Sequence, residues 1–454
     1  MDLRELLAAT AASVAGYRER AAEGPVFPET SPESVRDALG ALPDGPTPAA
    51  EVVDVLTKAA EPGLVATTGP RYFGFVIGGA LDSATAADLL TTGWDQNGFN
   101  AISSPAAAAV EDTAAAWLKD LLGLPATASA GFVTGGQAAN TVCLAAARQH
   151  VLARAGWDVE RDGLAGAPRI RVLAGADRHA TIDRALRLLG LGTGAVVPVR
   201  TDAQGRTDIG ELTRLLSEVD GPRIVCLQAG DVNTGAFDDF PAAIGAAHAH
   251  GAWVHVDGAV GLWAAASPGL RHLVAGAEAA DSWSTDGHKW LNVPYDSGYA
   301  FCAHPDAHAA ATALTAAYLI GQDGFRAPSA FALESSRRAR GFATWAALRE
   351  LGRSGLADLV DRCCALARRF ATRLEDGGVT IGNDVVLNQV LAAFGDDERT
   401  RRVLAAVQRS GVCWMGGTTW HGREYMRISV SSWRTTETDI DRSADAVLAA
   451  FRAC

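Results

Sequence analysis

Lysine is almost absent from this chain of 454 residues. Lys58, Lys119 and Lys289 are its three lysines, and the other 37 of its 40 basic residues are arginine. Lys58 and Lys119 fall on polar positions of expected amphipathic helices, as solvated surface lysines usually do. Lys289 instead follows a turn and precedes a tryptophan. A lysine can lose its proton at accessible pH and its amine can form a Schiff base, whereas arginine does neither, so Lys289 is a candidate nucleophile.

Other absences narrow the class of protein. No apolar run approaches the roughly 18 residues needed to span a bilayer, and the N-terminus lacks the basic start and apolar centre of a signal peptide. The seven cysteines are scattered and have no CxxC spacing, which is typical of reduced cysteines in a cytoplasmic protein. The net charge of -12 argues against a nucleic-acid-binding protein. We therefore expect a cytoplasmic protein that binds neither membrane nor nucleic acid.

A chain of this length is expected to form two or three domains. Residues 1–78 contain short helices and turns, which predict an N-terminal helical segment. In residues 79–345 short apolar strands alternate with helices, which predicts a large α/β domain with a mainly parallel sheet. Residues 346–454 open in a long helix and then mix strands and helices, which predicts a small α+β C-terminal domain.

The turn at Gly135 and Gly136 is the first segment suited to binding a ligand. It runs directly into an amphipathic helix that begins "GGQAAN" and includes Gln137. Exposed backbone N–H groups at a helix N-terminus form a site suited to phosphate. The segment is neither a Walker loop nor a GxGxxG motif, so a flexible turn before a helix is the alternative interpretation.

His179 and Asp257 stand at the ends of expected strands. His179 begins a helix at the sheet edge where ligand sites collect, although a helix-start histidine without a role is the alternative. Asp257 ends an apolar strand, where a carboxylate is costly unless it faces a metal, an arginine or a cationic ring nitrogen. His255 points to the same face as Asp257, but His248 and His250 do not share a helix face. We therefore expect no metal site.

Together with Lys289, these segments meet the needs of one cofactor. Pyridoxal 5'-phosphate needs a helix N-terminus for its phosphate and a carboxylate for its pyridinium nitrogen. It also needs a stacking partner for its ring and a lysine for its aldehyde. The four segments therefore predict a pyridoxal-phosphate site.

The same residues resemble those of a known family. "HVDGAVGLW" and "STDGHKWLNVPYDSG" are similar to segments of the group II pyridoxal-phosphate-dependent amino-acid decarboxylases, which include the aromatic-L-amino-acid and glutamate decarboxylases. "SPAAAAVE" resembles the SPA…E segment of that family, and "SSRRARG" resembles its arginine–arginine segment. The resemblance implies the fold-type I, aspartate-aminotransferase-like large domain. It also implies a homodimer with active sites at the subunit interface.

The resemblance further implies a role for each site residue. Lys289 would hold the cofactor as a Schiff base, Asp257 would keep its ring nitrogen protonated, and Ala259 would lie against its ring. His179 would stack on the opposite face, near the substrate carboxylate. The phosphate and ring region would be contacted by residues of two segments, namely Gly135, Gly136, Gln137, Asp286 and His288.

The activity implied is decarboxylation of an L-amino acid to the amine and CO₂. Tyr318 stands where the family carries a mobile-loop tyrosine that returns a proton to the substrate carbon, with a packing tyrosine as the alternative. Phe75, Val76 and Ile77 are candidate pocket residues, and their apolar character suits an aromatic or aliphatic substrate side chain. The turn "TGGQAAN" and the segment "PYDSG" depart from the aromatic decarboxylases and leave the substrate open.

Other functions remain open at this point. The same cofactor chemistry supports oxidative deamination to an aldehyde, transamination and Cα–Cβ bond cleavage. A pyridoxal-phosphate-binding regulatory protein without turnover is the non-enzyme alternative. The last alternative is a metal-dependent hydrolase that uses the histidine and aspartate residues.

Overall fold

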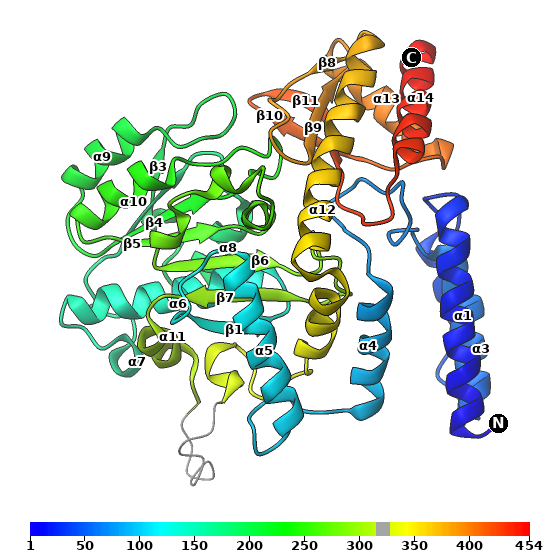
Figure 1. Ribbon diagram of the computed structural model, residues 1–454, viewed down its shortest axis with the longest axis horizontal. Helices are drawn as coiled ribbons and strands as arrows, with labels where there is room; N and C mark the ends of the chain where they lie inside the picture. Colours follow the sequence, from blue (N-terminus) through cyan, green and yellow to red (C-terminus); the bar gives the residue numbers. More distant parts are fainter. Residues whose placement is uncertain (315–326) are drawn as a thin grey trace. The chain divides into compact units, whose positions relative to one another are not determined.

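The computed structural model describes residues 1–314 and 327–454, and it divides into two compact units (Figure 1). The larger, which we call the central unit, contains residues Ala80–Ala365 and Asn383–Gln389. The other, which we call the terminal unit, contains residues Met1–Gly79, Leu366–Gly382 and Val390–Cys454. The domain boundaries expected after residues 78 and 345 remain predictions. Among the described helices, none has both the length and the apolar character needed to cross a membrane.

A seven-stranded sheet forms the middle of the central unit (Figure 1), with the strand order β1-β7-β6-β5-β4-β2-β3. Strand β7 runs antiparallel to both of its neighbours, whereas the other paired strands are parallel. The mainly parallel sheet expected from the sequence is thereby confirmed. The strand bounds are β1 Ser129–Val133, β2 Arg171–Gly175, β3 Val196–Val199, β4 Arg223–Gln228, β5 Trp253–Asp257, β6 Ser282–Asp286 and β7 Gly298–Cys302.

Helices connect and cover these strands (Figure 1). The helix α12 bends at Gly352, where a φ of 59° places the backbone in a conformation that glycine adopts without strain. The helices that lie in or enter the central unit are α4 Asp82–Trp94, α5 Pro105–Leu121, α6 Gly136–Arg154, α7 Val159–Asp162, α8 Ala180–Leu188, α9 Ile209–Glu218, α10 Phe240–Ala249, α11 Pro305–Thr312 and α12 Gly341–Asp376.

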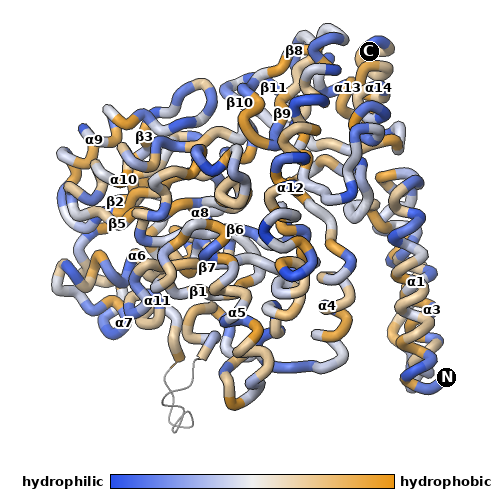
Figure 2. Tube along the Cα trace, viewed as in Figure 1, coloured by the Kyte–Doolittle hydropathy of each residue, from blue (hydrophilic) through white to orange (hydrophobic). Residues whose placement is uncertain are grey.

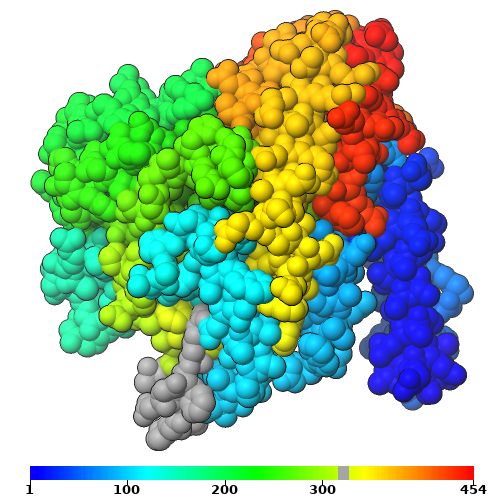
Figure 3. Space-filling view, in the orientation of Figure 1, coloured from blue at the N-terminus to red at the C-terminus, as the bar shows by residue number. Residues whose placement is uncertain are grey.

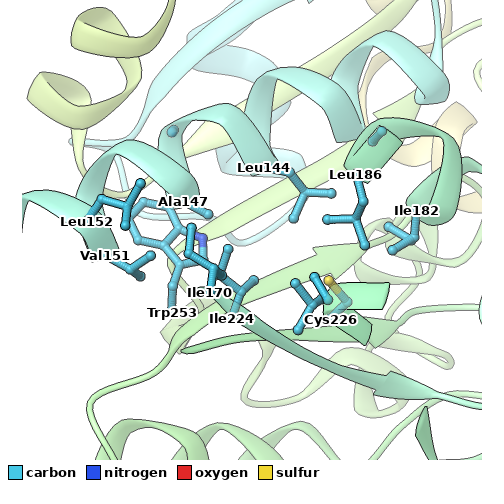
Figure 4. Packing of buried hydrophobic residues seen from close by; sticks show 14 of the residues in the cluster. Leu144, Ala147, Val151, Leu152, Ile170, Ile182, Leu186, Ile224, Cys226 and Trp253 are labelled. Carbon is cyan, nitrogen blue, oxygen red and sulfur yellow. The ribbon is translucent and has the colours of Figure 1, made fainter. Parts of the chain in front are cut away.

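The core of the central unit lies between the sheet and the helices α6 and α8. Strands covered on both faces need nearly continuous apolar sequence, and Figure 2 shows this along β2. Leu144 of α6 and Leu186 of α8 point toward Ile224 and Cys226 of β4 (Figure 4). Each fully buried leucine or isoleucine contributes about 1.5–3 kcal/mol to folding. This packing fixes α6 and α8 against the sheet, so their first residues are held at its edge.

Strands β1 and β7 were not expected from the sequence. Both are five residues long and contain glycine and alanine, which have low strand propensity. They pair in antiparallel register from Ser129 opposite Cys302 to Val133 opposite Gly298. A Cβ atom on Gly298 would lie 2.5 Å from the Cα of Gly135, so glycine is required where the turn after β1 crosses β7.

The terminal unit combines helices with a four-stranded sheet of order β10-β11-β9-β8, which confirms the small α+β region expected. Buried Arg71 links its separate parts, because its Nη2 donates to the backbone carbonyls of Ala22 and Gly24 and its Nη1 donates to that of Val412. The element bounds are α1 Leu3–Glu23, α2 Pro32–Leu39, α3 Ala49–Ala60, β8 Thr380–Ile381, β9 Gln389–Ala393, α13 Asp397–Ser410, β10 Gly416–Trp420, β11 Arg423–Ser429 and α14 Glu437–Ala453.

A buried ion pair joins two of the sequence motifs inside the central unit. Arg337 of "SSRRARG" places its Nη2 2.7 Å and 2.8 Å from the two carboxylate oxygens of Glu111 in "SPAAAAVE". The side chains are only 1% and 2% exposed. Nearby, Trp117 and Trp345 stack with ring centroids 6.1 Å apart, and Figure 3 shows α5 in cyan beside the yellow start of α12. The ion pair therefore fixes the segment before α12 to α5.

We predict that Arg337→Met lowers the free energy of unfolding by about 3–5 kcal/mol, because a buried carboxylate then loses its paired cation. The double variant Arg337→Met/Glu111→Leu recovers much of this loss, since no buried charge is left behind. Urea denaturation followed by tryptophan fluorescence measures both.

The matched control is Arg338→Met. Arg338 pairs with Asp88 at 2.8 Å, but the two side chains are 37% and 34% exposed, so its loss costs at most about 1 kcal/mol. Equal losses for Arg337→Met and Arg338→Met would show that the buried pair does not stabilise the unit.

Candidate active site

Four strands of the central unit end at one edge of the sheet and carry the candidate residues there. Strand β1 runs in the same direction as β6, because both pair antiparallel with β7. Gly135 follows β1, His179 follows β2, Asp257 ends β5 and Asp286 ends β6. The carboxyl edge of a parallel sheet is where ligands bind in such folds. The topology thus brings together residues that lie up to about 150 positions apart in the chain.

A pocket opens at this edge, with about 430 Å³ of space unfilled by protein atoms. It includes Lys289 and most of the other candidate cofactor residues. Gly135 and His288 are not among its lining residues but lie against each other, since a Cβ atom on Gly135 would be 2.8 Å from the Cε1 of His288. The lining residues are Gly136, Gln137, Asn140, His179, Thr181, Gln228, Gly230, Val232, Asp257, Ala259, Val260, Asp286 and Lys289.

The Lys289 amine lies at an acidic wall of the pocket. Its Nζ is 3.0 Å from the Oδ2 of Asp286, whose side chain is 2% exposed. The backbone N–H of Gly136, the first residue of α6, donates to the Oδ1 of the same carboxylate. A buried carboxylate requires such partners to remain charged. Asp286 therefore ties Lys289 to the start of α6.

His288 contributes a neutral ring beside this carboxylate. Burial is the largest cause lowering its pKa. Its Nδ1 accepts a hydrogen bond from the backbone N–H of Ser297 at 3.3 Å, so its Nε2, 3.4 Å from the Oδ1 of Asp286, carries the proton. Tyr295 of "PYDSG" stacks on the same ring with centroids 4.3 Å apart. The "PYDSG" segment thereby packs against the lysine-bearing turn.

Asp257 supplies a second buried carboxyl group to the pocket lining. Its side chain is 7% exposed. The Nδ2 of Asn140 donates to its Oδ2 at 2.9 Å, and the backbone N–H of Ala259 donates to its Oδ1 at 3.2 Å. A carboxylate that accepts two N–H groups is stabilised in its charged form.

His179 is the N-cap residue of α8. Its Nδ1 lies 2.8 Å from the Oγ1 of Thr181, and its backbone N–H donates to the Oε1 of Gln228 at 3.2 Å. These contacts hold the imidazole at the pocket between α8 and the end of β4.

The set of donors fits pyridoxal 5'-phosphate. The pocket offers an amine, a buried carboxylate, an aromatic ring and a helix N-terminus, which are the groups that this cofactor uses. Among residues 1–314 and 327–454, no group of three or more His, Cys, Asp or Glu side chains is arranged to hold a metal ion.

Four other candidates are not among the described residues of the central unit. Tyr318 falls outside the described residues. Phe75, Val76 and Ile77 belong to the terminal unit, where Phe75 is 60% exposed and Val76 is buried. Phe75 and Val76 have φ values of 53° and 59°, a conformation uncommon in residues other than glycine. That these three residues line the substrate pocket remains a prediction.

Sequence reasoning missed several lining residues, chiefly Asn140, Thr181 and Gln228. A signal existed for Asn140, because it stands four residues after Gly136 on α6 and therefore shares its face. Asp231 lies in the loop after β4, and its Oδ1 accepts hydrogen bonds from the backbone N–H groups of Asn233 and Thr234. Burial raises its pKa.

Known proteins share both this fold and these sequence features. The pyridoxal-dependent decarboxylase conserved domain matches residues 32–391. Tryptophan decarboxylase 1 of Oryza sativa subsp. japonica is 28% identical over 95% of this chain and 90% of its own. Phenylacetaldehyde synthase of a Rosa hybrid cultivar is 27% identical over 79% and 72%. L-2,4-diaminobutyrate decarboxylase of Rhizobium meliloti (strain 1021) is 30% identical over 80% and 74%.

The fold is matched by solved structures. The crystal structure of Oryza sativa TDC with PLP and tryptamine superposes with a TM-score of 0.93 and covers 100% of this chain and 98% of that one, at 24% identity. Since the conserved domain spans most of the chain, the expected family is confirmed. The chain belongs to the pyridoxal-dependent decarboxylase family, and it is an amino-acid decarboxylase that uses pyridoxal 5'-phosphate.

Proposed function

We propose that the pocket at the sheet edge holds pyridoxal 5'-phosphate on Lys289 and that the substrate is an L-amino acid with an aromatic or apolar side chain. The products are then the amine and CO₂. One observation carries the proposal: the pocket collects Lys289, Asp257, His179 and the N-terminus of α6. These groups match the aldehyde, ring nitrogen, ring face and phosphate of this cofactor.

Each residue has a separate task in this proposal. Lys289 would hold the cofactor aldehyde through its amine and would displace the product amine at the end of turnover. Asp257 would keep a proton on the ring nitrogen, and Ala259 would lie against one ring face. His179 would lie against the other face, near the substrate carboxylate. The phosphate region is contacted by the N-terminal residues of α6 and the lysine turn, namely Gly135, Gly136, Gln137, Asp286 and His288.

The bound cofactor supplies an electron sink for the bond between Cα and the carboxylate. The protein then has to orient that bond and return one proton to the substrate Cα. We assign the donation of this proton to Tyr318, with His179 as the alternative donor. His179 is suited to this task because its Nδ1 is engaged with Thr181, which leaves Nε2 as the protonated nitrogen.

The substrate class rests on the candidate pocket residues and on the names of relatives. Phe75, Val76 and Ile77 carry no charge that would select a charged substrate side chain. The names of two relatives refer to tryptophan and to phenylacetaldehyde, which are aromatic, although a third refers to diaminobutyrate. We therefore assign an aromatic or apolar amino acid.

We also propose that the enzyme works as a homodimer in the cytoplasm. All seven cysteines lie in the described residues and form no disulfide there, and six of them are buried, as expected in a reducing compartment. The family resemblance supports a dimer with active sites at the subunit interface.

The purified protein, supplied with pyridoxal phosphate, is expected to release equal amounts of CO₂ and amine from L-tryptophan, L-tyrosine or L-phenylalanine. Glutamate and 2,4-diaminobutyrate should react far more slowly. Lys289→Ala should lower kcat by at least about 1,000-fold, because the amine that exchanges with substrate is gone. Mass spectrometry of the amine and trapped ¹⁴CO₂ measure both products.

Lys119→Ala is the matched control. The Lys119 amine donates to the backbone carbonyls of Ala126 and Ala128, away from the pocket, so kcat should stay unchanged. Retained turnover in Lys289→Ala would overturn the site assignment. A change in the cofactor spectrum with every amino acid but no product would favour a regulatory protein.

A second activity is favoured by the likeness to a phenylacetaldehyde synthase. In that reaction the amino acid, O₂ and water give an aldehyde, CO₂, ammonia and H₂O₂. We predict that the native enzyme makes amine, whereas Tyr318→Phe lowers amine formation by about 100-fold and releases aldehyde with H₂O₂, because the proton donor is lost. A peroxidase-coupled assay alongside amine detection separates the two. Aldehyde as the main product of the native enzyme would instead assign the oxidative activity, and a keto acid would indicate transamination.

A further inference from the structure

A chain of buried hydrogen bonds runs through the central unit to Asp257. The indole N–H of Trp253 donates to the Oγ of Ser282 at 2.9 Å, and the Nδ1 of His255 lies 3.0 Å from the same hydroxyl. On the other side of the imidazole, Nε2 lies 2.9 Å from the Oδ1 of Asn140. The Nδ2 of Asn140 then lies 2.9 Å from the Oδ2 of Asp257. All five side chains are buried.

The charge of Asp257 sets the direction of every bond in this chain. A carboxylate can only accept, so Asn140 must turn its NH₂ group to Asp257 and its Oδ1 to His255. The Nε2 of His255 therefore carries the proton, and its Nδ1 accepts from Ser282. Burial, which lowers the pKa of His255 to about 4, keeps the ring neutral. The hydroxyl of Ser284 also donates to the Oδ1 of Asn140, at 2.6 Å.

The same amide reaches the second proposed catalytic side chain. The Nδ2 of Asn140 donates to the Oγ1 of Thr181 at 3.0 Å, which leaves the Thr181 hydroxyl proton for the Nδ1 of His179 at 2.8 Å. The backbone N–H of Thr181 donates to that nitrogen as well, at 3.3 Å. One amide is thus hydrogen-bonded to Asp257 directly and to His179 through one hydroxyl.

We propose that Asn140 is a positioning residue for the cofactor ring. Its amide, oriented by His255 and Ser284, holds Asp257 in the charged form that the ring nitrogen requires, and through Thr181 it keeps the proton of His179 on Nε2. The inference rests on the proposed function in one respect, because it takes Asp257 as the partner of the ring nitrogen. The alternative is that Asn140 only fills the space between α6 and β5.

The test compares two ligands that differ at one atom. Pyridoxal phosphate and its 1-deaza analogue, which has carbon in place of the ring nitrogen, are titrated into Lys289→Ala protein so that binding is non-covalent. Adding Asn140→Leu, which is nearly isosteric, should weaken the binding of pyridoxal phosphate by about 10- to 100-fold, as expected for losing a hydrogen bond to a charged group. Binding of the analogue should weaken by less than about threefold, because the analogue has no ring nitrogen to pair with Asp257.

Two further variants isolate the orientation of the amide. His255→Phe removes the donor to the Oδ1 of Asn140 and should reproduce the selective loss in weaker form, whereas His255→Gln keeps an N–H and should restore binding. Val142→Ala is the control for loosening the same helix, since buried Val142 packs in an apolar cluster with Val133 and Ala300. It should change neither ligand's affinity.

Equal weakening of both ligands by Asn140→Leu, or no weakening of either, would overturn the inference and leave Asn140 a packing residue. If Asn140→Leu fails to fold, as judged by circular dichroism, the His255→Phe and His255→Gln pair decides by the same comparison. These affinities are independent of turnover. A native protein that releases no CO₂ from any amino acid would contradict the proposed function while leaving the ligand comparison intact.

Discussion

The carboxylate of Asp257 has to stay charged although it is buried at the carboxyl end of β5. Many of the surrounding polar contacts meet that requirement. Burying an unpaired carboxylate costs far more than a single interaction can return. The N–H groups of Asn140 and Ala259 provide the compensation. Because Asn140 must then face its oxygen inward, His255 and Ser284 are required as donors behind it. The charge of Asp257 at the pocket thus requires the neutral polar side chains of His255 and Ser284 in the core.

The sheet determines where that charge can be used. Parallel strands β2, β4, β5 and β6 end at a common edge, and β7 allows β1 to run in the same direction. The glycine contact between Gly298 and Gly135 lets the turn after β1 approach β7 closely. The backbone N–H of Gly136 can then donate a hydrogen bond to Asp286. Core packing of α6 and α8 on the sheet holds Asn140 and His179 in place. The fold therefore delivers an amine, a carboxylate, a ring and a helix N-terminus to one pocket.

The fold class and most of the candidate site could be predicted from sequence. Alternating strands and helices show where the carboxyl edge of the sheet lies, and the candidate cofactor residues follow the strands at that edge. Asp257 ends a strand, His179 and Gly136 stand at helix starts, and Lys289 lies in the turn after β6. The pocket contains all four. Sequence could place Asn140 only on the same helix face as Gly136 and gave no signal for Thr181, since the contacts of both residues depend on how α6 and α8 pack. Likewise, Glu111 and Arg337 are 226 residues apart, and the Gly- and Ala-containing β1 and β7 carry little strand signal. The roles of Tyr318 and of residues 75–77 remain predictions.

The scarcity of lysine permits an unusually direct test of the site. Borohydride reduces the bond between pyridoxal phosphate and a lysine amine, and peptide mass spectrometry then locates the label. With only Lys58, Lys119 and Lys289 in the chain, the result is unambiguous. The site assigned here predicts a pyridoxyl group on Lys289 in stoichiometric amount. Labelling of Lys58 or Lys119 instead, or none at all in protein that contains the cofactor, would contradict it.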